Sequence, residues 1–209
     1  MSGVEREPAA LRHGKTVPTA YHTIGGRHPD GTPISLGAWT FETPQVRDVV
    51  ECYLTGDVLN ACAGKTHLSH PTIHRNDLDD RRDADTHHDV RDLDDYLPAE
   101  SFDVVVFDPP FDGEQAREHY DGRTVGRGPS GGIWAARKAL GRLTCPGGRV
   151  LSVGWNSVGL SHLNDFEREA VHLFQRPQKP DVFLTVDRKT QTTLANAANR
   201  SVGAEVEQQ

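Results

Sequence analysis

The stretch that most constrains this chain is a short apolar run followed by an acid, two prolines and an aromatic ring. Residues 104–107 read Val-Val-Val-Phe, a pattern typical of a strand buried on both faces of a sheet. Asp108, Pro109, Pro110 and Phe111 follow directly. Because proline fixes φ and carries no N–H, the chain leaves the sheet here in a stiff, extended form. A carboxylate, carbonyl groups and a ring are therefore expected at the carboxyl end of a strand, where open α/β sheets bind ligands.

Such a group can accept both hydrogens of a planar amino group and stack on the ring that bears it. The alternative interpretation is a buried strand that ends in an ordinary Pro-Pro turn. The tetrapeptide alone does not decide between them, because short motifs also occur by chance.

Length and composition indicate one domain in a reducing compartment. The 209 residues suffice for a single full core, and no run of 18 apolar residues is present. The N-terminus lacks the apolar segment of a secretory signal. Three cysteines, Cys52, Cys62 and Cys145, are too few and too scattered for a disulfide framework. We therefore expect a cytoplasmic protein without a membrane span.

Charge is unevenly distributed along the chain. The net charge is -7, and an acid-rich, lysine-poor composition suits a proteome adapted to high salt. Residues 77–112 are strongly acidic, whereas residues 113–142 turn basic. This basic segment could lie along a phosphate backbone, or it could be a solvated helix face. Its cationic residues are Arg117, Arg123, Arg127, Arg137, Lys138 and Arg142.

Strand and helix patterns alternate, which predicts a mostly parallel α/β sheet. One helix should begin at Thr43-Pro44 and end before Gly56, and a second should cover residues 131–143. Two closing strands with a short connection suggest an antiparallel hairpin at one edge of the sheet. The expected strands are 57–63, one within 67–78, 84–90, 102–108, 149–153, 168–176 and 181–187.

Five motifs follow one another in the order of a known family. The chain resembles the class I S-adenosylmethionine (AdoMet) methyltransferases over about residues 39–189. More narrowly, it looks like the amino-methyltransferases of adenine N6 and cytosine N4 in DNA. The matching residues are Asn60, Ala61, Cys62, Ala63 and Gly64 in the AdoMet loop, Asp77 and Asp89 at strand ends, Asp108, Pro109, Pro110 and Phe111 in the catalytic tetrapeptide, and residues 146–150 at a Pro-Gly-Gly turn.

The resemblance implies a Rossmann-like fold, with a mostly parallel seven-stranded sheet, an antiparallel edge hairpin and helices on both faces. It implies AdoMet as cofactor, held by the 60–64 loop, with Asp77 at the ribose hydroxyls and Asp89 at the adenine. Residues 39–189 would form the methyltransferase domain. A partly irregular extension (1–38) would precede it, and a polar, disordered tail (190–209) would follow.

The resemblance also implies a reaction. The Asp108 carboxylate and the Pro109 carbonyl would accept the two N–H groups of an exocyclic amine and draw its lone pair out of the ring, while Phe111 stacks on the base. The acceptor would be nucleic acid, with DNA favoured over RNA; protein glutamine or a small amine remains an alternative. No separate recognition domain fits in the chain, so specificity would be relaxed or supplied by a partner subunit.

Several residues have a competing interpretation. Asp77 could be a turn aspartate and Asp89 a solvated charge. Gly64-Lys65-Thr66 resembles the end of a P-loop, which would make the chain an NTPase, but the first glycine of that motif falls on Leu59. The spacing of the histidines predicts no metal site.

Overall fold

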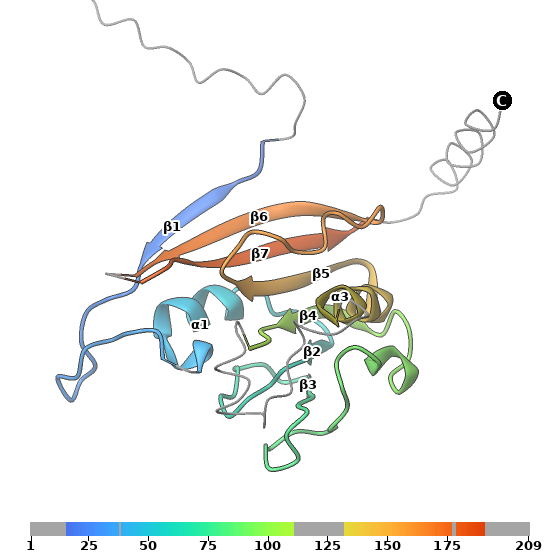
Figure 1. Cartoon of the computed structure of the whole chain (residues 1–209), viewed down its shortest axis with the longest axis horizontal. Helices are drawn as coiled ribbons and strands as arrows, with labels where there is room; N and C mark the ends of the chain where they lie inside the picture. Colours follow the sequence, from blue (N-terminus) through green and yellow to red (C-terminus); the bar gives the residue numbers. More distant parts are fainter. Residues whose placement is uncertain (1–15, 38, 111–131, 177–178, 191–209) are drawn as a thin grey trace, which may run out of the picture.

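The computed structural model describes residues 16–37, 39–110, 132–176 and 179–190, which include one seven-stranded sheet (Figure 1). No helix within these ranges has the length and apolar character needed to cross a membrane. The sheet order is β1-β6-β7-β5-β4-β2-β3. Its strands are β1 (Thr19–Thr23), β2 (Val58–Asn60), β3 (Ile73–Arg75), β4 (Phe102–Phe107), β5 (Thr144–Gly154), β6 (Phe166–Gln175) and β7 (Val182–Lys189). The helices are α1 (Pro44–Glu51), α3 (Gly132–Leu143) and the short 3-10 turns η1 (Thr40–Glu42) and η2 (Leu93–Asp95).

Strand β4 lies inside the sheet, as its apolar run predicts. It pairs in parallel with β2 on one side and with β5 on the other. Residues 104–107 are at most 1% exposed, so both faces of the strand are covered. Side chains alternate along a strand, and accordingly Val104 and Val106 enter one apolar cluster while Val105 and Phe107 enter the other.

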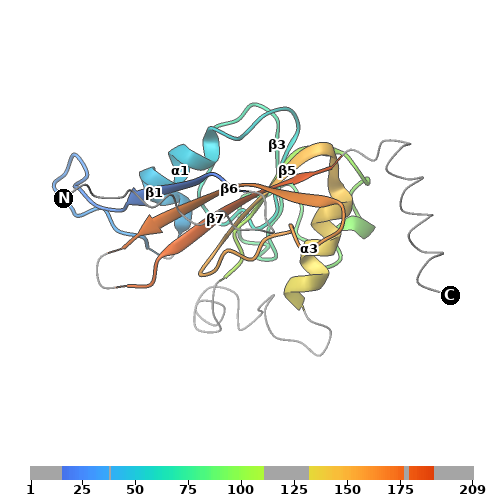
Figure 2. The ribbon, with the colours of Figure 1, turned by 90° about the horizontal axis from the view of Figure 1, so that it is seen from above.

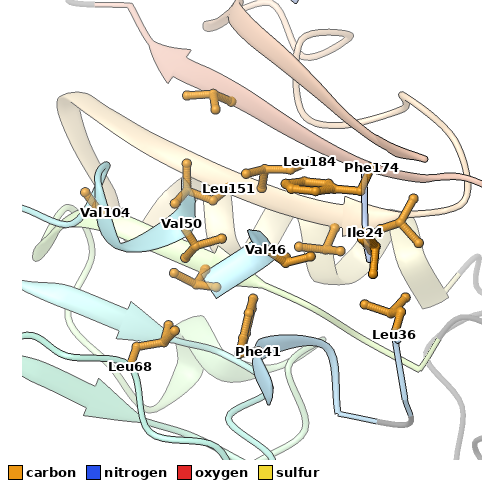
Figure 3. Packing of buried hydrophobic residues seen from close by; sticks show 14 of the residues in the cluster. Ile24, Leu36, Phe41, Val46, Val50, Leu68, Val104, Leu151, Phe174 and Leu184 are labelled. Atoms are coloured by element: carbon orange, nitrogen blue, oxygen red, sulfur yellow. The ribbon is translucent and has the colours of Figure 1, made fainter. Parts of the chain in front are cut away.

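Helices cover both faces of the sheet, which confirms the predicted layers. On one face, Val46 and Val50 of α1 are fully buried against the side chains of β4 and β5 (Figure 3). On the opposite face, Ala136, Leu140 and Leu143 of α3 pack in the second cluster. The Thr43-Pro44 start of α1 is also confirmed.

The antiparallel end of the sheet differs in one respect from the expectation. Strand β7 runs antiparallel to both β5 and β6, as the predicted hairpin requires. However, this pair does not form the edge, because β1 adds in parallel outside β6. The ring of His22 stacks on Phe174 and His172 of β6 and helps to hold β1 there. The segment 19–23 shows no apolar period, so this long-range contact leaves little trace in the sequence.

The strand expected at residues 84–90 is reduced to one isolated parallel bridge between Asn76 and Thr86. Side chains form hydrogen bonds with backbone N–H groups that would otherwise pair in a β-ladder. Asp85 accepts the Arg75 N–H (2.8 Å), and the Asn76 amide oxygen accepts the His88 N–H (3.0 Å). Asp and Asn compete with regular ladders in this way, and the segment stays irregular.

Candidate active site

The carboxyl ends of β2 and β4 lie side by side, which brings two predicted motifs together. Asn60 pairs with Val106 across the parallel ladder, and the Ala61 N–H donates to the Val106 carbonyl (2.9 Å). Asp108 follows Val106 by two residues. The 60–64 loop and the acid-Pro-Pro segment therefore leave the sheet at the same edge. Phe111 lies outside the described residues.

The Cys62 thiol feels the charge of all three predicted carboxylates. Burial raises the pKa of the Cys62 thiol well above its ordinary value, and the charges of Asp77, Asp108 and Asp89 raise it further. A thiol held neutral in this way is not a nucleophile, so Cys62 acts as a small packing residue of the loop.

Buried polar atoms at the two strand ends lack partners within the described part of the chain. Asn60 is fully buried, yet neither its amide oxygen nor its amide nitrogen forms a hydrogen bond there. Asp108 Oδ1 is also buried without such a bond. Unsatisfied groups of this kind cost about 1–3 kcal/mol each, and native structures carry few of them. Three such atoms lie at these adjacent strand ends, which makes this edge of the sheet a candidate place for a polar ligand.

Asp108 has an unusual protonation equilibrium. Burial raises the pKa of its carboxyl group to about 7. A hydrogen bond from the Thr40 side chain acts in the opposite direction and lowers this pKa. Thr40 lies in η1 and is itself buried, so the bond connects the segment before α1 to the end of β4. Asp108 can therefore change between acid and carboxylate near neutral pH.

Asp77 supports the turn of the 60–64 loop. One of its oxygens accepts the Gly64 N–H (2.7 Å), and the other accepts the Asp79 N–H (2.9 Å). Gly64 has φ of +56°, a conformation that glycine adopts more readily than other residues. Asp77 is 1% exposed, and these bonds give it a direct structural role as a turn aspartate. A role at the cofactor ribose remains a proposal.

Asp89 is held by its own turn. Its carboxylate accepts the Arg91 backbone N–H (2.9 Å) and forms a two-point ion pair with the Arg91 guanidinium. Although burial raises the pKa of Asp89, the bonds from Arg91 outweigh that effect and keep the pKa below its ordinary value. Asp89 is thus a fixed, ionised carboxylate at the rim of the site.

Sequence reasoning missed the segment that covers the loop. A Cβ atom at Gly64 would lie 3.1 Å from the Trp39 ring, so this ring packs directly on the turn. Lys65 lies over the same ring (5.4 Å to its centroid) and pairs with Glu42 (2.9 Å). Together with Thr40, these contacts place residues 39–42 across the candidate site. Only the Thr-Pro helix start hinted that this segment is ordered.

The P-loop interpretation of Gly64-Lys65-Thr66 is wrong. A P-loop needs a helix that begins at this point to direct N–H groups at phosphate, and residues 66–72 contain no helix. Lys65 is also engaged with Glu42 and Trp39.

The cationic residues of the predicted basic segment fall into three groups. Arg137 is buried and donates to the Val158 carbonyl (2.5 Å), and Arg142 pairs with Asp94. Lys138 is exposed on α3. Arg117, Arg123 and Arg127 lie outside the described residues.

Comparison with known proteins supports the fold class. No protein-family model and no curated protein sequence matches this chain, whereas solved structures do. TrmN from Thermus thermophilus matches with a TM-score of 0.52 and 17% identity over 73% of this chain and 50% of that one. The 1,6-didemethyltoxoflavin-N1-methyltransferase from Burkholderia thailandensis, solved with 1,6-didemethyltoxoflavin and S-adenosylhomocysteine bound, matches with a TM-score of 0.50 and 14% identity over 71% and 78%.

These likenesses, together with the strand order and the antiparallel β7, show that the chain has the Rossmann-like class I methyltransferase fold. The match spans only half the length of TrmN.

Proposed function

We propose that this protein transfers the methyl group of AdoMet to an exocyclic amino nitrogen of a nucleic-acid base. The observation that carries the proposal is the set of buried, unsatisfied polar atoms of Asn60 and Asp108 at adjacent strand ends. Open α/β sheets bind ligands at that edge, and a ligand with its own donors and acceptors would remove the cost of leaving these atoms unpaired.

The residues of the loop fit AdoMet. Ala61 and Ala63 are small and buried, so the backbone can come close to a ligand beside the Gly64 turn. The Asn60 amide offers both a donor and an acceptor. Asn60, Ala61, Cys62, Ala63 and Gly64 would hold the cofactor, with Asp77 and Asp89 on its ribose and adenine. Each Asp77 oxygen accepts one backbone N–H, and a carboxylate retains further lone pairs for hydroxyl groups.

Bound AdoMet would supply an electrophilic methyl group. The protein's task is then to present the amine. As a carboxylate, Asp108 would accept one N–H of the acceptor, and the carbonyl of Pro109 would accept the other. Pro110 would keep the segment stiff and Phe111 would stack on the base. These bonds would draw the nitrogen toward tetrahedral geometry, so that its lone pair leaves conjugation with the ring and points at the methyl group. After methyl transfer the nitrogen would lose one proton to solvent.

The tetrapeptide resemblance favours DNA adenine N6 or cytosine N4 as the acceptor, with an RNA base next. A small heteroaromatic acceptor is the second candidate, because the Burkholderia structure of the same fold holds 1,6-didemethyltoxoflavin. Transfer of tritiated methyl groups from AdoMet to duplex DNA, single-stranded DNA, RNA, protein and small amines, at low and high salt, tests these classes. Label confined to protein or small molecules would contradict the nucleic-acid proposal.

A further inference from the structure

Three partly exposed apolar side chains lie on α3 and on the loop that follows β5. Trp134, Trp155 and Val158 are 43%, 42% and 45% exposed. Trp134 lies in the first turn of α3, and the other two lie in the loop that follows β5. Arg137 joins the helix to this loop, because its guanidinium lies 5.3 Å from the Trp134 ring centroid and donates to the Val158 carbonyl (2.5 Å). We call Trp134, Trp155, Val158 and His162 the aromatic surface; the His162 ring packs edge-on against Trp134.

The aromatic surface adjoins the catalytic edge of the sheet. Ser152 of β5 pairs with Phe107 of β4, so both chains leave the sheet at the same end, one as Asp108 and the other as Trp155. Figure 2 shows the β5–β6 connection running back across the sheet on the side where α3 lies. Leu160 of this connection packs in the same cluster as α3. A ligand that reaches Asp108 would therefore have this surface beside it.

Buried charges hold the loop in place. Asp187 is fully buried and accepts the Leu160 N–H (2.6 Å) and the Arg168 side chain (2.5 Å). Arg168 also donates to the Ser157 carbonyl (2.8 Å). A Cβ atom at Gly159 would lie 1.9 Å from Asp187 Oδ2, so the loop is packed directly on the carboxylate. Asp187 and Arg168 thus fix the loop from its buried side, while Trp155 and Val158 remain partly exposed.

One exposed cation lies beside the aromatic surface. Of the three cationic side chains in residues 132–143, Arg137 is buried and Arg142 pairs with Asp94, which leaves Lys138. Lys138 is exposed one helical turn after Trp134, on the same side of α3. Aromatic rings with an exposed cation beside them are how proteins bind single-stranded nucleic acid without reading its sequence.

We propose that the aromatic surface binds unpaired nucleotides next to the target base, with Trp134 and Trp155 stacking on bases and Lys138 contacting a phosphate. The proposal rests on the proposed function, because it assumes that the acceptor at Asp108 belongs to a nucleic acid. Such a surface would hold a polymer beside the candidate site. It also predicts little sequence preference, since every base has a π-face.

The test is fluorescence anisotropy with labelled 12-nucleotide single-stranded RNA, single-stranded DNA and duplex DNA. Trp134→Ala and Trp155→Ala should each weaken single-strand binding roughly tenfold, and Phe at either position should restore part of it. Lys138→Gln should lower the salt slope by about one. Tyr21→Ala, an exposed aromatic on β1, is the matched control and should bind as the wild type does.

Wild-type affinity in both tryptophan variants, or a wild-type protein that binds none of the three probes, would overturn the proposal. AdoMet binding to the same variants, measured by calorimetry, distinguishes failure of the surface proposal from failure of the proposed function. Tryptophan-dependent binding without AdoMet affinity would support the surface and contradict the enzyme. Methyl transfer to nucleic acid with unchanged KM in the tryptophan variants would support the enzyme and reject the surface.

Discussion

At the residue scale, the catalytic role that we propose for Asp108 comes with a stability cost. Asp108→Asn keeps the shape of the side chain but offers one carbonyl oxygen in place of a charged carboxylate. We expect methyl transfer to fall about 100-fold or more. AdoMet affinity by calorimetry should stay within about twofold, because the proposal assigns Asp108 to the acceptor and not to the cofactor. Near-normal turnover would remove Asp108 from the mechanism.

The same variant should be more stable at pH 8. Unfolded Asp108 ionises near pH 4, whereas the folded residue ionises only near pH 7, so above pH 7 the folded state bears the cost of a buried charge. Asn does not carry that cost. The gain should exceed about 1 kcal/mol at pH 8 and shrink toward pH 4, as measured by urea unfolding.

Thr40 should set the pH at which Asp108 works. Its hydrogen bond stabilises the carboxylate, so Thr40→Val should raise the pKa of Asp108. If the carboxylate is the active form, turnover should rise with pH as it forms, and the midpoint of this rise should move up by about half a pH unit or more in the variant. Thr43→Val is the control, because the Thr43 hydroxyl bonds to the Ser35 carbonyl instead. A profile that does not move would contradict this role of Thr40.

At the scale of elements, Asp77 supports the 60–64 loop, which we propose holds the cofactor. Asp77→Ala leaves the N–H groups of Gly64 and Asp79 without their acceptor. We expect AdoMet binding to weaken by about 1–3 kcal/mol. Asp77→Asn keeps one acceptor oxygen and should lose less. Calorimetry that shows an unchanged dissociation constant for the alanine variant would place Asp77 outside the cofactor site.

Three elements meet at His172, which makes the edge of the sheet sensitive to acid. His172 of β6 bonds to His22 of β1 (3.0 Å) and to Tyr53 after α1 (2.8 Å). Burial lowers the pKa of both histidines. Since the unfolded residues take up protons first, below about pH 6.5, stability should fall as the pH drops below that value. It should level off below the folded pKa values.

Melting temperatures between pH 5 and 7.5 test this expectation. His172→Gln should show a weaker dependence on pH than the wild type, and the difference between the two proteins cancels the contribution of Asp108. Amide exchange should report early loosening of β1 in acid, because β1 is the edge strand. Parallel curves for the two proteins would rule out the histidine pair as the cause.

At the scale of the whole molecule, ligand binding should stabilise the fold by mass action. AdoMet at about 100 times its dissociation constant should add about 2.7 kcal/mol and raise the melting temperature by several degrees. ATP with Mg²⁺ should not, because the structure lacks the helix that a P-loop needs. Stabilisation by ATP alone would overturn the assignment of the site.

The sequence determined the parts of the molecule that depend on neighbouring residues. The apolar run at 104–107 predicted β4, and Thr43-Pro44 predicted the start of α1. The order of motifs predicted the sheet and, with it, that Asn60 and Asp108 leave the sheet at adjacent strand ends. These signals are local. A few consecutive residues suffice to indicate a strand buried on both faces, a proline with a fixed φ angle or the alternation of a strand.

Only the tertiary structure decided the rest. His22 and His172 are 150 positions apart, and their contact makes β1 a strand. The bond from Thr40 to Asp108 and the packing of Trp39 on Gly64 likewise join distant segments. Side chains of Asp85 and Asn76 replace the ladder that residues 84–90 were expected to form. A local sequence pattern reflects the secondary-structure propensity of neighbouring residues. The contacts named here depend instead on which distant groups form hydrogen bonds and pack together when the chain folds.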